Sequence, residues 1–199
     1  MIAQPTLQYP TAFAKTQQAI LEECAVRTAA AISFGESLLS LPAKQLNARP
    51  AEDAWSALEC VAHLNDYADM YLAQLQQRSA KAPPRRQEKY APGLLGKRLA
   101  LAMHPNRRDK KMRSPSHTNH LHADLDAALL DAFLVHLRGY QKVIQQLRSK
   151  SIRGSRVPFS LTPLVRFHLG DILMCLVWHN ARHIDQATEA LSLTEAKVR

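Results

Sequence analysis

Four long helical stretches constrain this chain to an all-α fold. Within them apolar side chains recur every three or four residues, which is the period of a helix buried along one face. The chain has only six glycines, and few of its segments alternate between apolar and polar residues as a strand would. The predicted helices cover residues 11–41, 56–78, 124–149 and 162–191. Helices of this number and length in 199 residues predict a four-helix bundle that forms one domain over residues 1–199.

Two of these helices have recognisable start signals. Ser56 and Glu59 have the spacing of a capping box, with the serine as N-cap and the glutamate at the third helical position. Trp55 precedes them, where an apolar side chain can pack back onto the first turns of the helix. Thr162 and Pro163 match an N-cap followed by proline at the first helical position. These signals predict helix starts at residues 56 and 162.

The segment 78–122 separates the second predicted helix from the third. It contains five prolines, twelve Lys or Arg residues and two acidic residues, and only residues 93–103 have a helical pattern. The rest of the chain is close to neutral, because its fourteen basic residues face fifteen acidic ones. We interpret the segment as a long crossover between helices, with a solvated basic surface. Binding to nucleic acid is the less favoured alternative, since no known DNA-binding pattern accompanies the charge.

Three histidines are the candidate functional residues. His179 and His183 are four residues apart, so their rings lie one above the other on the same helix face. That face also bears Ile172 and Leu176, which places both rings among apolar neighbours, where an imidazole needs a partner. Together with His63 on the second helix, the pair can converge on one divalent metal ion. The alternative is a set of core histidines that neighbouring carboxylates or carbonyls satisfy.

The chain resembles the DinB/YfiT-like superfamily of metal-binding four-helix bundles. One signature, Trp-Ser-x-x-Glu-x-x-x-His-Leu, lies at the start of the second helix and consists of Trp55, Ser56, Glu59, His63 and Leu64. The other, His-x-x-Arg-His-x-x-Gln, lies in the last helix and consists of His179, Arg182, His183 and Gln186. A smaller match is the basic-small-proline pattern at residues 111–115. The order and lengths of the helices agree with the family over nearly the whole chain.

This resemblance implies a function and a cofactor. The metal triad of the family corresponds to His63, His179 and His183. Members of the family typically hold nickel or zinc there, with water in the remaining positions. Some relatives transfer a low-molecular-weight thiol (bacillithiol, mycothiol or glutathione), and others are regarded as metal-dependent hydrolases. The resemblance therefore implies a small-molecule substrate, and a homodimer, because relatives often pair through the faces of their bundles.

The chemistry of three imidazole ligands agrees with a catalytic site. Neutral ligands leave a divalent ion with its full charge and at least one open position, whereas structural zinc sites are usually closed by four protein ligands. Such an ion lowers the pKa of bound water or stabilises a thiolate. Asp66 and Gln186 are the candidate catalytic residues. Asp66 is placed to accept a proton from His63 or to act as general base, or it is only a surface carboxylate; Gln186 is placed to orient a histidine or the water.

Other residues near the triad allow more than one interpretation. Cys60 and Cys175 each lie one helical turn before a triad histidine. Either could close the site as a fourth ligand, but small buried apolar residues are the favoured interpretation. The remaining histidines form no comparable pair. Three of them are expected to be solvated in the proline-rich segment, and these are His117, His120 and His122.

Cysteine usage and hydropathy predict a cytoplasmic protein. The three cysteines are far apart and fall inside helical patterns, which argues against a disulfide framework. The first residues lack the pattern of a secretory signal, and the longest strongly apolar run, residues 172–178, is too short to cross a membrane. No membrane partner is expected. The sequence thus predicts a divalent-metal-dependent thiol transferase or hydrolase, with a non-catalytic, stress-related metal-binding bundle as the alternative.

Overall fold

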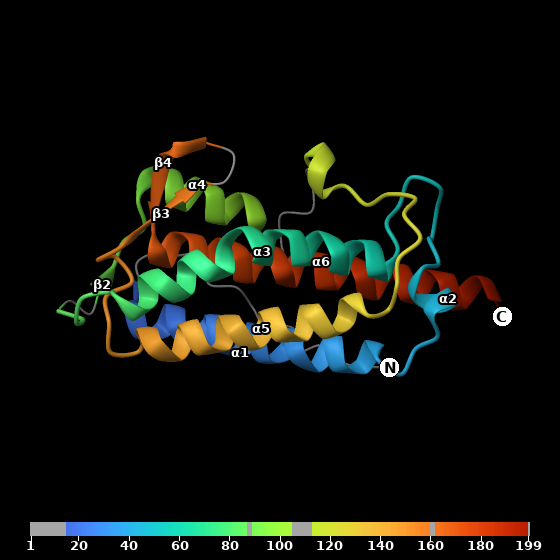
Figure 1. Ribbon diagram of the computed structural model, residues 1–199, viewed down its shortest axis with the longest axis horizontal. Helices are drawn as coiled ribbons and strands as arrows, with labels where there is room; N and C mark the ends of the chain where they lie inside the picture. The colour runs from blue at the N-terminus through green and yellow to red at the C-terminus, as the bar shows by residue number, and fades with distance from the viewer. Residues whose placement is uncertain (1–14, 87–88, 105–112, 160–161, 199) are drawn as a thin grey trace.

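Four long helices form the body of the molecule (Figure 1). The computed structural model describes residues 15–86, 89–104, 113–159 and 162–198. The long helices are α1 (Gln17–Leu38), α3 (Ala57–Ala80), α5 (Leu129–Leu147) and α6 (Leu169–Val198). Both α1 and α3 pack against α5 and α6. Helices α1 and α3, consecutive among the long helices, are thus separated in space, and the predicted all-α four-helix bundle is confirmed.

Short helices and strands lie around the four long helices. The predicted short helix of the crossover is present as α4 (Leu94–Met103), with Gly93 at its N-cap. The remaining short elements are β1 (Lys15–Thr16), α2 (Ala43–Leu46), β2 (Lys89–Tyr90), the 3-10 turn η1 (Ser116–Thr118), β3 (Arg156–Phe159) and β4 (Thr162–His168). Strand β1 pairs antiparallel with β2, and β3 pairs antiparallel with β4. Helix α4 packs along α6, so the crossover returns to the bundle (Figure 1).

The start of the last helix is the largest error of the sequence-based prediction. Helix α6 begins at Leu169, and residues 162–168, predicted as its first turns, form strand β4 instead. Two-residue alternation explains the difference: Leu164 and Arg166 are exposed, whereas Phe167 is buried and its ring packs against Phe159 of β3 at 5.4 Å. This tertiary pairing outweighs the local Thr-Pro helix signal.

The other helix ends also differ, most at the end of α6, which extends to Val198 whereas the sequence predicts an end at residue 191. Thr16 is the N-cap of α1, and its side chain accepts a hydrogen bond from the Ala19 amide. The earlier residues predicted as helix, 11–14, lie outside the described residues. The third predicted helix, 124–149, is shorter at both ends in α5, and the loop predicted at 42–53 contains α2. Shifts of one or two residues are common where helix ends fray.

The capping box at the start of α3 is confirmed. Ser56 Oγ accepts a hydrogen bond from the Glu59 amide at 3.2 Å, and Glu59 Oε2 accepts one from the Ser56 amide at 2.7 Å. The Glu59 side chain is completely buried, and its charge is balanced by Arg49, whose guanidinium lies 2.7 Å from Oε1. Arg49 also donates to the carbonyl of Ala123 at 3.1 Å. One arginine therefore connects the start of α3 to the segment before α5.

Replacing Arg49 with alanine is expected to destabilise the protein by about 2 kcal/mol, because it leaves a buried carboxylate without its partner. This loss of stability is smaller than the loss expected for a fully buried ion pair, because the Arg49 side chain is 26% exposed. Urea denaturation measures it. Arg138→Ala is the matched control, since Arg138 pairs with Glu36 at 3.5 Å on the surface and should cost less than about 0.5 kcal/mol. Equal losses of unfolding free energy in the two variants would contradict the conclusion that Arg49 balances a buried charge.

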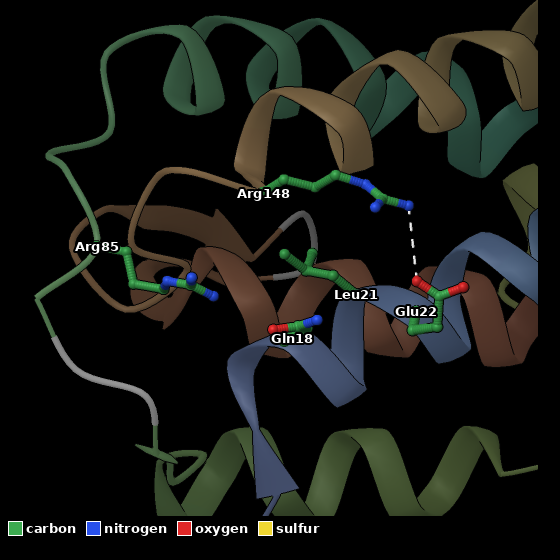
Figure 2. A pocket seen from close by; sticks show the side chains of 5 residues that line it. All are labelled: Gln18, Leu21, Glu22, Arg85 and Arg148. Carbon is green, nitrogen blue, oxygen red and sulfur yellow. Dashed lines mark ion pairs between the residues drawn. The ribbon is translucent and has the colours of Figure 1, made fainter.

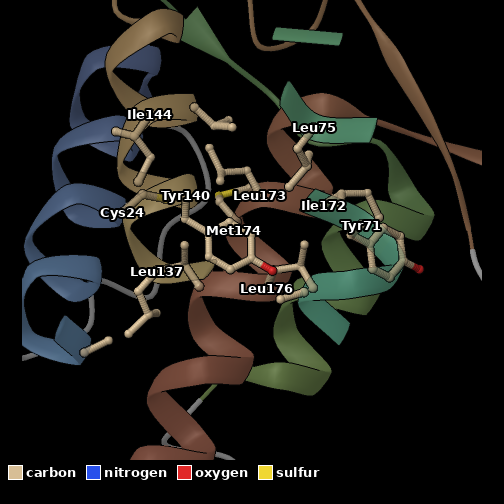
Figure 3. Packing of buried hydrophobic residues seen from close by; sticks show 14 of the residues in the cluster. Cys24, Tyr71, Leu75, Leu137, Tyr140, Ile144, Ile172, Leu173, Met174 and Leu176 are labelled. Carbon is tan, nitrogen blue, oxygen red and sulfur yellow. The ribbon is translucent and has the colours of Figure 1, made fainter. Parts of the chain in front are cut away.

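The core between the long helices is apolar (Figure 3). One buried cluster includes Leu137 and Tyr140 of α5, Leu75 of α3 and Leu173 of α6, and each of the four is at most 2% exposed. All three cysteines are buried, and none of them is in a disulfide. Among the described residues, none of the helices combines the length and apolar character needed to span a lipid bilayer.

A buried polar contact fixes the crossover to the N-terminus of α6. The Tyr90 hydroxyl donates to Asp171 Oδ1 at 2.5 Å, and both side chains are almost fully buried. Burial raises the pKa of the Asp171 carboxyl, while the tyrosine hydrogen bond partly opposes the rise. Gly96 of α4 lies directly over the same carboxylate, and a Cβ there would overlap it. A glycine is therefore needed where α4 approaches α6 this closely.

Candidate metal centre

Three histidine rings meet between α3 and α6. His63 lies in the second turn of α3, and His179 and His183 lie on successive turns of α6. One ligand atom from each ring can be chosen so that all three lie within 4.8 Å of one another. The ring centroids are 4.6 to 5.0 Å apart. The packing of α3 on α6 thus brings together the three residues that the sequence singles out.

The spacing of the ring nitrogens fits a metal ion. Nε2 of His63 and Nε2 of His179 are 3.2 Å apart. Two ligands on one four-coordinate ion with bonds of about 2.1 Å lie about 3.4 Å apart. The observed distance is close to this value before any adjustment of the side chains. The donor set of three imidazoles is also one that divalent nickel and zinc accept.

Hydrogen bonds fix two of the rings in the tautomer that a metal requires. His63 Nδ1 lies 2.8 Å from the carbonyl oxygen of Thr118, which can only accept, so the proton is on Nδ1. His183 Nδ1 lies 3.0 Å from Gln186 Oε1 and donates to it in the same way. In both rings Nε2 then has a free lone pair. Ligand histidines in metal sites usually have such a partner on the other nitrogen.

The third ring has no such partner. His179 is 6% exposed, and its Nδ1 is a buried side-chain nitrogen without a hydrogen-bond partner within the described part of the chain. Its Nε2 lies 3.2 Å from His63 Nε2. A buried polar group with no partner reduces stability, and a structural histidine would be expected to have one. His179 therefore lacks at Nδ1 the partner that His63 and His183 have, and its place in the site rests on the approach of its Nε2 to His63.

Burial keeps the three imidazoles neutral. It is the largest cause lowering the pKa of each ring, and the pKa of His179 falls well below its usual value because His183 and His63 add to the effect. For His183 the pKa is lowered to about 3. The hydrogen bonds to Thr118 and Gln186 oppose the shifts of His63 and His183. Neutral rings keep their lone pairs at neutral pH, as metal binding requires.

Two aromatic residues form the walls of the site. The Trp55 ring lies 4.9 Å from His63 and stacks on His183 at 5.6 Å. The Tyr67 ring lies 4.9 Å from His63 and 4.6 Å from His179, its hydroxyl is hydrogen-bonded to the Thr118 side chain, and burial raises its pKa. The sequence predicts Trp55 only as a capping residue, although its place in the family signature already connects it with His63. It packs against the small cluster containing Cys60, as expected, and also against the triad.

The neighbours of the triad differ in part from the predicted ones. Asp66 does not accept the proton of His63, since the Thr118 carbonyl does. Its carboxylate pairs with His120, with 2.7 Å between Oδ2 and Nε2. His120 was predicted to be solvated, but its side chain is only 27% exposed and contacts α3 through Asp66. Every residue has a backbone carbonyl, so the sequence gives no sign that the carbonyl of Thr118 accepts the hydrogen bond from His63.

The cysteines do not join the candidate ligands. The group of possible ligand atoms found in the described residues contains the three histidines and neither Cys60 nor Cys175. Burial raises the pKa of both thiols, to about 12 for Cys175, which opposes formation of a thiolate ligand. The burial and the raised pKa values agree with the interpretation of Cys60 and Cys175 as small buried core residues.

Part of the basic segment that was weighed for nucleic-acid binding, including residues 107, 108, 110 and 111, lies outside the described residues.

A separate surface pocket of about 220 Å³ lies away from these residues (Figure 2). It is lined by Gln18, Leu21, Glu22, Arg85 and Arg148. Arg148 pairs with Glu22 at 3.6 Å across it, and both side chains are more than 60% exposed. The pocket contains none of the candidate site residues, so it has no part in the argument for metal binding.

Residues 33–187 match the family model of the DinB superfamily, and this range includes all three histidines. No curated protein matches the chain. Among solved structures, the chain is similar to YfiT from Bacillus subtilis, described as a probable metal-dependent hydrolase with an unusual four-helix bundle topology. The TM-score is 0.40 at 19% sequence identity, and the match covers 98% of this chain and 94% of that chain.

Proposed function

This chain belongs to the DinB superfamily, and from that premise we propose that it is a metal-dependent enzyme whose ion is held by His63, His179 and His183. The observation that supports the proposal most is the 3.2 Å approach of two Nε2 atoms, those of the buried His63 and His179, within a group of three neutral imidazoles. We propose nickel or zinc as the ion, because both accept imidazole ligands.

The reaction we propose is transfer of a low-molecular-weight thiol or hydrolysis of a small molecule. A divalent ion with three neutral ligands keeps its full charge, and so favours ionisation of a thiol or water beside it. No carboxylate belongs to the candidate ligand group of the described residues, so no ligand charge reduces the attraction for an anionic thiolate. Trp55 and Tyr67 provide apolar walls that restrict access of water to the rings.

The proposed roles of the other residues follow from their contacts. Gln186 orients His183 through the hydrogen bond to Nδ1, so it acts through the ligand and not on the substrate. Asp66, one turn after His63 on α3, is the proposed acid–base group. Its carboxylate is 30% exposed and bonded to His120, so a proton taken up there is shared with the imidazole. The cytoplasmic location and the homodimer expected from the sequence stay predictions.

The proposal is tested by metal analysis followed by a thiol screen. The purified protein is expected to contain about one equivalent of nickel or zinc, because the site has one set of ligands. The metal-loaded protein is then assayed with glutathione, bacillithiol and mycothiol against a chromogenic electrophile, and with chromogenic esters for hydrolysis. Thiol-dependent product that disappears on chelation supports the transferase, and ester cleavage that disappears supports the hydrolase.

Two outcomes would contradict the proposed enzymatic function. A protein that binds no divalent ion would remove the basis of the proposal. A protein that binds one equivalent but is inactive with every thiol and ester would instead support the alternative of a non-catalytic metal-binding bundle. The matched control is the His63→Ala variant, which should give the background rate in each assay.

A further inference from the structure

The segment 114–120 of the crossover is held against α3 by several contacts, among them the hydrogen bond between Tyr67 and the Thr118 side chain and the approach of Ser114 Oγ to His63 Nδ1 at 3.4 Å. The Thr118 carbonyl lies 2.8 Å from His63 Nδ1, and His120 Nε2 lies 2.7 Å from Asp66 Oδ2. His63 and Asp66 are three residues apart, so they occupy neighbouring positions on the same side of the helix. The two contacts join parts of the chain more than fifty residues apart in sequence.

Little regular structure supports this segment. Its core is the three-residue turn η1, in which the Thr118 amide donates to the Pro115 carbonyl at 3.0 Å. The hydroxyls of Ser114 and Thr118 are 2.8 Å apart. Thr118 itself is completely buried, although its flanking residues Asn119 and His117 are exposed. The position of the buried carbonyl therefore depends on contacts that the segment makes with its surroundings.

The residues after the turn are also constrained. His122 has a φ of 68°, in the left-handed region that non-glycine residues rarely adopt. This conformation costs about 1 kcal/mol or more and persists only where the surrounding contacts impose it. The contacts on either side are the Asp66–His120 pair and the hydrogen bond from Arg49 to the Ala123 carbonyl. The chain thus reverses at His122 between two fixed points.

From this geometry we propose that His120 and Asp66 are positioning residues for the metal centre, because the hydrogen bond between them holds the Thr118 carbonyl on His63. The inference rests on the proposed metal site. A free imidazole can have its proton on either nitrogen, and only the tautomer protonated at Nδ1 can bind an ion through Nε2. The Asp66–His120 hydrogen bond thereby selects the tautomer of a ligand without contacting the ion.

The proposal predicts a loss of metal affinity in variants that are distant from the ion. His120→Ala and Asp66→Ala are each expected to weaken zinc binding ten- to a hundredfold, the usual effect of losing a partner beyond the ligands. His120→Gln should stay within a few-fold of the parent, since its amide can still donate to Asp66. Zinc affinity is measured by competition with a chromophoric chelator at pH 7.5. His117→Ala is the matched control, because His117 is exposed in the same turn.

A second measurement needs no metal. Long-range proton–nitrogen NMR of the chelator-treated protein reports which nitrogen of His63 has the proton. Nδ1 is expected in the parent and in His117→Ala, and a mixture of tautomers in His120→Ala and Asp66→Ala. Circular dichroism checks that the variants fold, because a contact whose two side chains are 27% and 30% exposed is not required for the bundle.

The outcomes separate this inference from the proposed function. Equal zinc affinity in His120→Ala and His117→Ala would overturn the positioning role and leave the metal centre intact. Absence of zinc binding in the parent would overturn the proposed function. In that case the tautomer measurement still decides the local question: a proton fixed on Nδ1 of His63 in every variant would show that the pair does not position Thr118.

Discussion

Replacing His183 with alanine is expected to lower the affinity for zinc or nickel about a thousandfold. The apparent free energy of binding zinc at a protein site is of the order of 12 kcal/mol, and removing one of three ligands forfeits about a third of it. His183 is a good position for this test because its Nδ1 is already satisfied by Gln186, so Nε2 is the atom left for the ion. His63→Ala should have a similar effect. Competition with a chromophoric chelator gives the affinities.

The control for these variants is another histidine on a long helix. His136 of α5 lies 3.0 Å from Asp69 and 3.0 Å from Asn65 Oδ1, so both of its nitrogens have protein partners. His136→Ala should therefore leave zinc affinity unchanged while removing a histidine from the chain. Unchanged metal content in both His63→Ala and His183→Ala would exclude the proposed centre.

Local signals in the sequence were enough to predict the helices that form the site. The capping box of Ser56 and Glu59 fixes where α3 begins, and therefore which face of it bears His63. The four-residue spacing of His179 and His183 places both rings on one face of α6. Both signals lie within one or two helical turns. Their meeting across the bundle was an expectation from the family resemblance, and the structure places the rings together.

Elements that depend on distant contacts were missed. Strand β4 exists because Val157 and Phe167 face each other in a hairpin, a pairing that neither segment reveals alone. The buried Asp171 accepts a hydrogen bond from Tyr90, which is 81 residues away in sequence. Local propensity favoured a helix start at Thr162, and tertiary pairing overrode it.

The surroundings of the triad were missed for a different reason. His63 is oriented by a main-chain carbonyl of Thr118, and every residue has such a group, so its position in sequence gives no signal. His120 was interpreted as solvated because its segment is rich in proline and charge. Its contact with Asp66 depends on how the crossover returns to α3. Ligands were thus easier to predict than the groups that orient them.

The metal-free protein is expected to lose stability sharply as the pH falls below about 6.5. In the unfolded chain each histidine takes up a proton near this pH, whereas burial lowers the pKa of His63, His179 and His183 in the folded state. The unfolded state then binds more protons, so acid favours unfolding. Each such group contributes up to about 1.4 kcal/mol per pH unit. Between pH 7 and 5.5 the expected loss is about 3 kcal/mol in total.

The sign and the window of this effect distinguish it from general acid denaturation. A lowered histidine pKa makes the protein most stable above pH 6.5. As the pH falls further, the free energy of unfolding keeps decreasing until the pH reaches the pKa of the histidine in the folded state, which is about 3 for His183. Carboxylates titrate mainly below pH 5, so urea denaturation at pH 7, 6.5, 6 and 5.5 isolates the histidines. His179→Gln removes one buried imidazole and should flatten the slope by about 1 kcal/mol per pH unit. A slope equal to that of the parent in this variant would mean that His179 is not held neutral, and the argument that its lone pair is available to a metal would fail with it.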